Sequence, residues 1–232
     1  MPINPSIKIL QAQGLGSRKV CEKIFHQDIT LVNDLPFDPS KDSLKYGDRI
    51  QISQESLVLK EKIYLMMNKP EGYETSHKPS GHPSVFDLLP PRYLARGVQA
   101  AGRLDVDTTG LLLLSDDGQF LHQMISGKKK DHLVVEKEYW ITTARPVVST
   151  QIEQLLTGVQ LHDEPEPIAA LAATQTGENQ ITMVITTGKY HQVKRMVAAT
   201  GNHVARLHRR RVGKYSLPED LASGQFKLID AH

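Results

Sequence analysis

The chain has 232 residues, 39% of them hydrophobic, and a formal net charge of +2, which is ordinary for a folded protein of one large or two smaller domains. Its longest aliphatic run is too short to cross a bilayer, and its first residues lack the apolar core of a secretory signal. Cys21 is the single cysteine, which excludes an internal disulfide and favours a reducing compartment. We therefore expect a cytoplasmic protein.

The basic residues gather in three clusters, although the net charge alone is too small to indicate a polyanionic partner. The clusters are Ser17–Lys19, Lys128–Lys130 and Arg206–Lys214. One such cluster is most often a solvated face of a protein. Three of them give nucleic-acid binding equal weight as an interpretation, before any motif is considered.

The first 55 residues have the pattern of a small, separate module. Ser17 is a suitable N-cap for a helix that runs to about His26. Strands are expected at 29–34 and 49–53, with turn-forming residues between them. The predicted domains are therefore a module over residues 1–55 and a larger domain behind a polar linker.

The larger domain, 63–232, follows the expected linker at 56–62. Apolar or alternating stretches predict strands at 63–67, 111–115, 138–144, 168–174 and 181–187. Helical periodicity predicts helices at 118–126, 149–159 and 190–200. Because these elements do not follow a regular β-α-β order, the sequence favours an α+β fold with a mixed, largely antiparallel sheet flanked by helices.

Two carboxylates, Asp105 and Asp107, come shortly before the apolar run Leu111–Leu114. A charge at the edge of a core costs free energy unless it is paired or used. The D-x-D pair could hold a divalent cation, but no third ligand follows nearby, and Asp107 suits a turn ahead of Thr108. Asp105 follows GRL, where we expect a strand to enter and a turn to leave, and a rigid scaffold presents reactive groups at such positions.

A helix over Tyr190–Ala199 would place Lys194 at the edge of its buried side, while Arg195 points away. A lysine at the rim of a core is a suitable partner for a rim carboxylate, because each keeps the other ionised. The alternative is that Lys194 only extends its ammonium group into solvent. This segment alone is compatible with both interpretations.

The stretch EKEYWITTA adds a tyrosine. Strand alternation puts Lys137, Tyr139 and Ile141 on one face and Trp140 on the other. Such a tyrosine is most often a half-buried core residue. It can also be a stacking platform for a base flipped out of its helix.

Several kinds of site lack their motifs. Neither H-E-x-x-H nor a cysteine pair occurs, and His203 and His208 lie among arginines, where contact with RNA or solvent is the better interpretation. The elbow of serine hydrolases, the P-loop and the dinucleotide fingerprint are also missing. We therefore expect no metal and no nucleotide cofactor, and Cys21 fits a core position better than a catalytic one.

Four blocks occur in the order typical of one family. GRLDVDTTGLLLL resembles the signature of the pseudouridine synthases in its GRLD-x-x-T-x-GL form, and EKEYW resembles their short tyrosine motif. TTGKYHQVKRM resembles their helix motif with its basic residue, and NKPEGY a segment near the start of their catalytic domain. The opening module resembles an S4-like RNA-binding domain. DVDTTGLLLLSDDGQ and YHQVKRMVAATGNHV are most similar to the members that modify small-subunit (16S) ribosomal RNA.

The resemblance implies an S4-like RNA-binding module followed by a pseudouridine-synthase catalytic domain, acting on a uridine of ribosomal RNA without metal or cofactor. The sequence carries no signal for dimerisation, so a monomer is the default expectation. It assigns the essential catalytic role to Asp105, with Lys194 holding its charge. Tyr139 is expected to pack on the target base and Arg103 to help keep it flipped out. Arg209 is the basic residue expected nearest the substrate. The residues expected to contact RNA are Arg18, Lys19, Arg206, Arg209, Arg210 and Arg211.

Three other functions fit parts of the sequence. A non-catalytic RNA-binding or ribosome-assembly protein could use the same modules and would not need Asp105. A synthase acting on large-subunit ribosomal RNA would share most motifs, with differences in the segment SDDG and at Lys194. A metal-dependent sugar-transfer enzyme using the D-x-D pair would lose activity to chelators.

Overall fold

The computed structural model describes residues 4–126 and 134–231. No helix within these ranges is long and apolar enough to cross a membrane. The chain divides into two compact units, the first formed by Met1–Ile63 with Leu89–Gln99 and the second by Tyr64–Leu88 with Ala100–His232.

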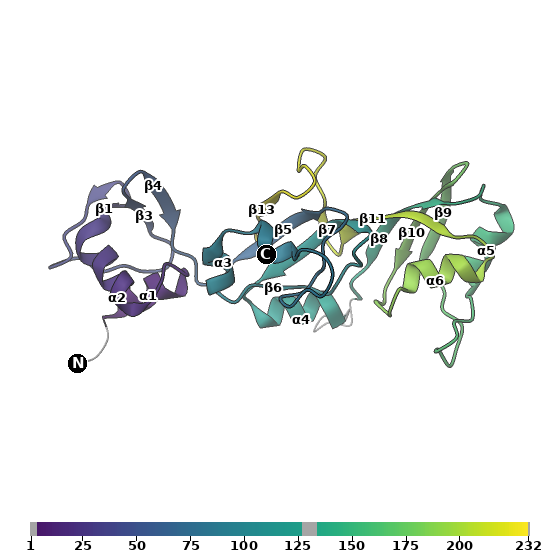
Figure 1. Ribbon diagram of the computed structural model, residues 1–232, viewed down its shortest axis with the longest axis horizontal. Coiled ribbons are helices and arrows are strands. Elements are labelled where there is room, and N and C mark those ends of the chain that lie inside the picture. Colours follow the sequence, from purple (N-terminus) through teal and green to yellow (C-terminus); the bar gives the residue numbers. More distant parts are fainter. Residues whose placement is uncertain (1–3, 127–133, 232) are drawn as a thin grey trace. The chain divides into compact units, whose positions relative to one another are not determined.

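The first unit combines short helices with a small antiparallel sheet (Figure 1). Its helical elements are α1 (Pro5–Ala12), α2 (Arg18–Lys23), the π-helical η1 (Ile24–Asp28) and α3 (Pro91–Ala95). Its strands, paired in the order β2-β1-β3-β4, are β1 (Ile29–Val32), β2 (Leu35–Pro36), β3 (Arg49–Ile52) and β4 (Glu55–Val58). The helix after Ser17 and the strands expected at 29–34 and 49–53 are therefore confirmed.

The capping residue of α2 is Ser17, as its type predicts. Its side chain accepts a hydrogen bond from the backbone N–H of Val20 at 3.5 Å. Cys21 and Phe25 lie one turn apart and pack in the core of this unit with Ile50. Burial raises the pKa of the Cys21 thiol, which is consistent with a core side chain.

The segment 56–62 differs from the polar linker that the sequence predicted. Strand β4 pairs with β3, so that Leu57 lies opposite Ile50, and Leu59 is fully buried in the core of the first unit. The alternation of apolar residues inside this polar stretch gives it a packed face, which average polarity does not reveal. The first unit therefore extends beyond residue 55.

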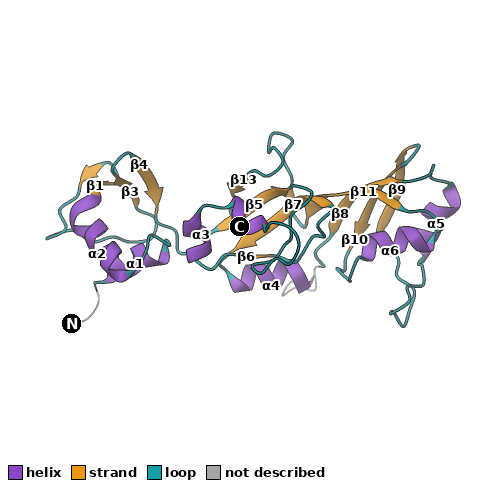
Figure 2. Cartoon of the chain, viewed as in Figure 1, coloured by secondary structure: helices purple, strands orange, loops and turns teal. Residues whose placement is uncertain are grey.

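The second unit is an α+β domain around one large sheet (Figure 2). The sheet runs β13-β5-β7-β11-β8-β10-β9, with β6 beside β7 and β12 beside β11. Among the described pairs, β7 and β11 are parallel and the others antiparallel, which confirms the predicted fold class. The helical elements are η2 (Val85–Leu88), α4 (Gly118–Ser126), α5 (Ser149–Thr157) and α6 (Gln192–Ala199). The strands are β5 (Tyr64–Lys69), β6 (Gln99–Ala100), β7 (Thr108–Ser115), β8 (Lys137–Thr143), β9 (Ala172–Gly177), β10 (Gln180–Ile185), β11 (Val204–Val212), β12 (Tyr215–Ser216) and β13 (Phe226–Leu228).

Most predicted elements of this unit are confirmed, and one strand is displaced. The prediction at 168–174 is wrong for its first part, because β9 begins only at Ala172. Ile168 instead forms an isolated bridge with Val159, after α5. Pro165 and Pro167 precede it, and proline cannot donate to a strand ladder.

Strand β7 is the centre of the core and carries the four leucines. Leu111 to Leu114 are all at most 1% exposed, so both faces of the strand are buried. On one face, Leu111 and Leu113 belong to a core cluster with Phe120 and Met124 of α4. Gly110, at φ +100°, lies opposite Arg209 of β11, and a Cβ there would be 2.4 Å from the Arg209 carbonyl oxygen. Only glycine permits this approach without a backbone shift.

Candidate active site

Asp105 lies in the loop between β6 and β7, with its side chain about one-third exposed. The prediction that a strand leads into Asp105 is wrong, because the strand β7 instead follows it. The loop is tied to its surroundings by backbone groups. The N–H of Gly72 donates to the Val106 carbonyl at 2.8 Å, and the N–H of Thr108 donates to the Asp105 carbonyl at 3.1 Å.

Lys69, at the end of β5, contacts the same loop from the core of the domain. Its ammonium group is buried and donates to the carbonyl oxygens of Pro70, Val106 and Thr108, at 2.9, 3.3 and 2.9 Å. Burial lowers the pKa of Lys69 to about 8, against the opposing effect of the nearby Asp107 and other carboxylates. The loop that presents Asp105 is thus fixed by hydrogen bonds from the core side.

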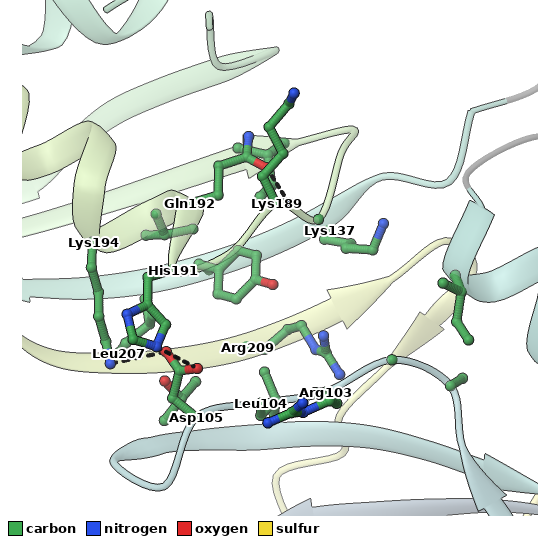
Figure 3. Close-up of a pocket in the computed structure, with 18 of the residues that line it drawn as sticks. Arg103, Leu104, Asp105, Lys137, Lys189, His191, Gln192, Lys194, Leu207 and Arg209 are labelled. Atoms are coloured by element: carbon green, nitrogen blue, oxygen red, sulfur yellow. Dashed lines mark hydrogen bonds and ion pairs between the residues drawn. The ribbon is translucent and has the colours of Figure 1, made fainter. Parts of the chain in front are cut away.

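Both oxygens of the Asp105 carboxylate have a partner on or beside α6 (Figure 3). Lys194 Nζ donates to Oδ2 at 3.0 Å, and His191 Nε2 lies 3.2 Å from Oδ1. His191 is at φ +46° just before the helix begins. Gln192 fixes this turn, because its side-chain oxygen accepts hydrogen bonds from the Lys189 N–H and the Thr187 hydroxyl.

Lys194 also pairs with Asp107, at 2.6 Å from its Oδ1. Burial raises the pKa of Asp107, but the hydrogen bond and charge of Lys194 outweigh it, so the pKa lies below its usual value. Burial likewise lowers the pKa of Lys194, and the two carboxylates more than compensate, so its pKa is raised. Lys194 therefore stays charged at neutral pH, and the interpretation that it only extends into solvent is wrong.

A pocket of about 680 Å³, including its open mouth, surrounds Asp105. Its walls come from the loop before β7 and the start of β7, from α4, β8, β10 and β11, and from the start of α6 with the turn before it. Tyr139, 7% exposed, lines it, and it shares a face of β8 with Lys137 and Ile141 as alternation predicted. Asp105 is the single carboxylate among the described lining residues. The cationic lining residues are Arg103, Lys137, Lys189, Lys194 and Arg209.

Besides Lys194, two predicted basic residues line the pocket, Arg103 and Arg209. Arg103 is exposed and forms no ion pair with any other residue that the structure describes. Arg209 is 3% exposed, and its Nε donates to the Leu111 carbonyl at 2.8 Å. Both positions are compatible with the predicted contacts of Arg103 and Arg209 with the substrate. These contacts stay a prediction.

The other predicted RNA contacts lie outside the pocket. Arg206 lines a separate groove with Trp140, and Arg210 stacks over the Trp140 ring at 5.3 Å. Arg211 is paired with Glu136 and Glu138. In the first unit, Arg18 pairs with Glu22 and Lys19 is exposed. The cluster Lys128–Lys130 falls outside the described residues.

Sequence reasoning missed three residues of this site: His191, Lys137 and Lys69. His191 had a usable signal, because it precedes Lys194 by three residues and one helical turn would bring both to the same side. Lys137 also had a signal, because strand alternation places it on the same face as Tyr139. Lys69 had none, since lysine is rarely buried. Among the described residues, no group of three or more His, Cys, Asp or Glu side chains is arranged to hold a metal ion.

A cation-lined pocket around one paired carboxylate is typical of an enzyme that acts on a polyanionic substrate. Residues 63–199 match the family model of the RNA pseudouridylate synthases, and the chain belongs to this family. It is therefore an enzyme that isomerises uridine to pseudouridine.

Named relatives and a solved structure agree with this membership. The ribosomal small subunit pseudouridine synthase A of Escherichia coli (strain K12) is 43% identical over 166 residues, covering 72% of this chain and 70% of the relative. The protein of the same name from Vibrio cholerae is 35% identical over 213 residues, covering 92% and 90%. A crystal structure of a pseudouridylate synthase aligns with a TM-score of 0.67 at 33% identity, covering 97% of this chain and 95% of that one.

Proposed function

We propose that this protein converts a uridine of small-subunit (16S) ribosomal RNA into pseudouridine, with Asp105 as its catalytic residue. The observation that carries the proposal is the Asp105 carboxylate, held in the pocket between Lys194 at 3.0 Å and His191 at 3.2 Å. The names of the relatives support the choice of RNA, since they are called ribosomal small subunit synthases.

The proposed reaction breaks the bond between ribose C1′ and uracil N1 and rejoins the base through C5. The ribose becomes electron-poor when the bond breaks, which is the problem that glycosidases solve with a carboxylate. Asp105 either attacks C1′ to form a covalent bond or removes a sugar proton to give a glycal. Both routes need an ionised Asp105, and the Lys194 ammonium group donates a hydrogen bond to its Oδ2 at 3.0 Å. The reaction is redox-neutral and needs no metal or nucleotide cofactor.

The target base has to leave its stack before it reaches Asp105, at a cost of a few kcal/mol. In the proposal, Tyr139 packs on the flipped base from the wall of the pocket. Arg103, which also lines the pocket, keeps the base from returning to its stack in the RNA. Contacts with phosphates offset the cost. The first unit would act as an S4-like RNA-binding domain through Arg18 and Lys19. Arg206, Arg210 and Arg211 would add further phosphate contacts. We further propose that the protein acts in the cytoplasm as a monomer.

The test uses unmodified small-subunit ribosomal RNA, both bare and with its early-binding ribosomal proteins. We expect the wild-type protein to produce one pseudouridine, mapped by carbodiimide-blocked primer extension. Asp105→Asn should lower the rate by at least about 10⁴-fold and leave RNA affinity intact, because it removes the charge at nearly constant size. Asp163→Asn, outside the pocket, is the matched control. Wild-type turnover by Asp105→Asn would refute the role of Asp105, and modification of large-subunit RNA alone would refute the choice of substrate.

A further inference from the structure

The pocket contains two cations that the steps above do not use. In Figure 3, Asp105, His191 and Lys194 gather at one end, while Arg209 and Lys137 lie away from them. Both come from the sheet, Lys137 from β8 and Arg209 from the neighbouring β11.

Both side chains are deeply buried without full compensation. Lys137 is 7% and Arg209 3% exposed. Within the described residues, Lys137 Nζ, Arg209 Nη2 and the neighbouring Thr108 hydroxyl have no hydrogen-bond partner. An unpaired buried ammonium or guanidinium group costs several kcal/mol. A protein that keeps two of them at the wall of one pocket has a use for positive charge there.

The nearest carboxylates along the chain do not neutralise Lys137. Glu136 comes just before β8, and Glu138 lies on the other face of that strand. Both pair with Arg211, at 3.0 and 3.4 Å. Arg209 is anchored through Nε, which donates to the Leu111 carbonyl, while Nη2 has no partner in the part of the chain that the structure describes. Burial lowers the pKa of Lys137, and the charge of Arg209 lowers it further. The positive charge of this wall is thus available to a ligand.

The register of the sheet places these groups around Tyr139. Arg209 lies directly opposite Tyr139 on the neighbouring strand, and Lys137 is two residues before it on the same face. A base that packs on Tyr139 therefore has a positively charged wall beside it. Uracil carries two carbonyl oxygens that can accept hydrogen bonds from such a wall.

We propose that Lys137 and Arg209, with the Thr108 hydroxyl, form a binding site for the carbonyl oxygens of the target uracil and stabilise the anionic base during the reaction. This inference rests on the proposed function of the pocket. When the C1′–N1 bond breaks, its electron pair leaves with N1, and the negative charge spreads to O2 and O4. Asp105 compensates the ribose by bonding to C1′ or by removing a ribose proton. When C5 bonds to C1′, either the Asp105–C1′ bond breaks or Asp105 returns the proton to the ribose, so that the carboxylate is regenerated. C5 then loses its proton and N1 gains one.

The alternative ligand, a backbone phosphate, fits the site less well. A phosphate carries the same charge throughout the reaction, so binding it would stabilise substrate and transition state equally. It is also linked to the chain on both sides, whereas a single flipped base can enter a pocket whose cations are almost fully buried. A cationic wall is most useful where negative charge develops only in the transition state.

The first experiment separates rate from affinity. Lys137→Met keeps the length of the side chain and removes its charge, and Lys227→Met on the exposed face of β13 is the matched control. In single turnover on the RNA that the wild type modifies, we expect Lys137→Met to be about 10²-fold slower, with an RNA dissociation constant within about twofold of wild type. Arg209→Gln should behave similarly and serves if Lys137→Met does not fold. Equal losses of rate and affinity would make the site a phosphate site and overturn the proposal.

The second experiment does not depend on finding the RNA target. The ring of 5-nitrouracil is ionised at neutral pH, so it imitates the uracil anion, and neutral uracil is its control. By calorimetry we expect the wild-type protein to bind 5-nitrouracil at least about tenfold more tightly than uracil. Lys137→Met should lose this preference, and Lys227→Met should retain it. Failure of the wild type to prefer the anion overturns this inference, whereas failure to modify any ribosomal RNA overturns the proposed function alone.

Discussion

Lys194 is shared by two carboxylates, and its positive charge offsets part of the negative charge that the D-x-D pair places next to the core. Its ammonium group lies 3.0 Å from Asp105 and 2.6 Å from Asp107. Asp107 is the more exposed carboxylate and has no role in the proposed chemistry. It adds a second negative charge that keeps Lys194 protonated, so that Lys194 remains in place beside Asp105.

Substitution of neighbouring basic residues on α6 tests this arrangement. Lys194→Ala should slow pseudouridine formation by roughly 10²-fold, because Asp105 loses its charged partner. Arg195→Ala should change the rate by less than about threefold, since Arg195 pairs with the exposed Asp163, and exposed pairs contribute roughly 0–1 kcal/mol. Single-turnover rates of the two variants decide the point, and equal losses would contradict the geometry of α6.

At the scale of the element, the parallel pairing of β7 with β11 depends on one glycine. Gly110→Ala would bring a Cβ within 2.4 Å of the Arg209 carbonyl, at φ +100° where a side chain is strained. We expect a loss of about 2 kcal/mol or more in the free energy of unfolding, measured by urea denaturation. Activity should fall as well, because Arg209 lines the pocket.

The matched control for this substitution is Gly118→Ala. Gly118 opens α4 and has open space where its Cβ would lie. Alanine there should leave the protein as stable as the wild type or stabilise it by roughly 0.5–1 kcal/mol, since glycine is the poorer helix former. Similar destabilisation by both substitutions would show that close packing at Gly110 is not the cause.

At the scale of the whole molecule, Lys69 makes the stability of the fold depend on pH. The pKa of Lys69 is about 8 in the folded protein, whereas the usual value for a lysine in water is 10.5. The unfolded chain therefore binds this proton more tightly than the folded protein does. The contribution of Lys69 to stability is therefore lowest below pH 8 and rises between pH 8 and 10.5. Unfolding in urea at pH 7.5, 9 and 10 should show the wild type gaining stability relative to Lys69→Met. A difference between the two that is constant across this range would contradict the assignment.

Local patterns predicted much of the fold and part of the site. The helix 118–126 and the strands around Leu111–Leu114 and Tyr139 follow from periodicity, because burial of one face dictates the spacing of apolar residues. The pairing of Lys194 with Asp105 was accessible as one of two interpretations, since both residues lie at the rim of a core. The boundary of the first unit could not be predicted from the sequence, because Leu57 and Leu59 lie in a stretch that is polar on average.

The sequence by itself determined the fold class, the family and the identity of the central carboxylate, because these depend on residue types at fixed local spacing. The tertiary structure alone decided which other side chains approach the loop of that carboxylate and line its pocket. His191 and Lys69 approach the Asp105 loop from α6 and β5, and Lys137 meets Arg209 across two strands. Such contacts join residues far apart in the chain, and the burial of a charged side chain leaves no periodic signal from which it could be predicted.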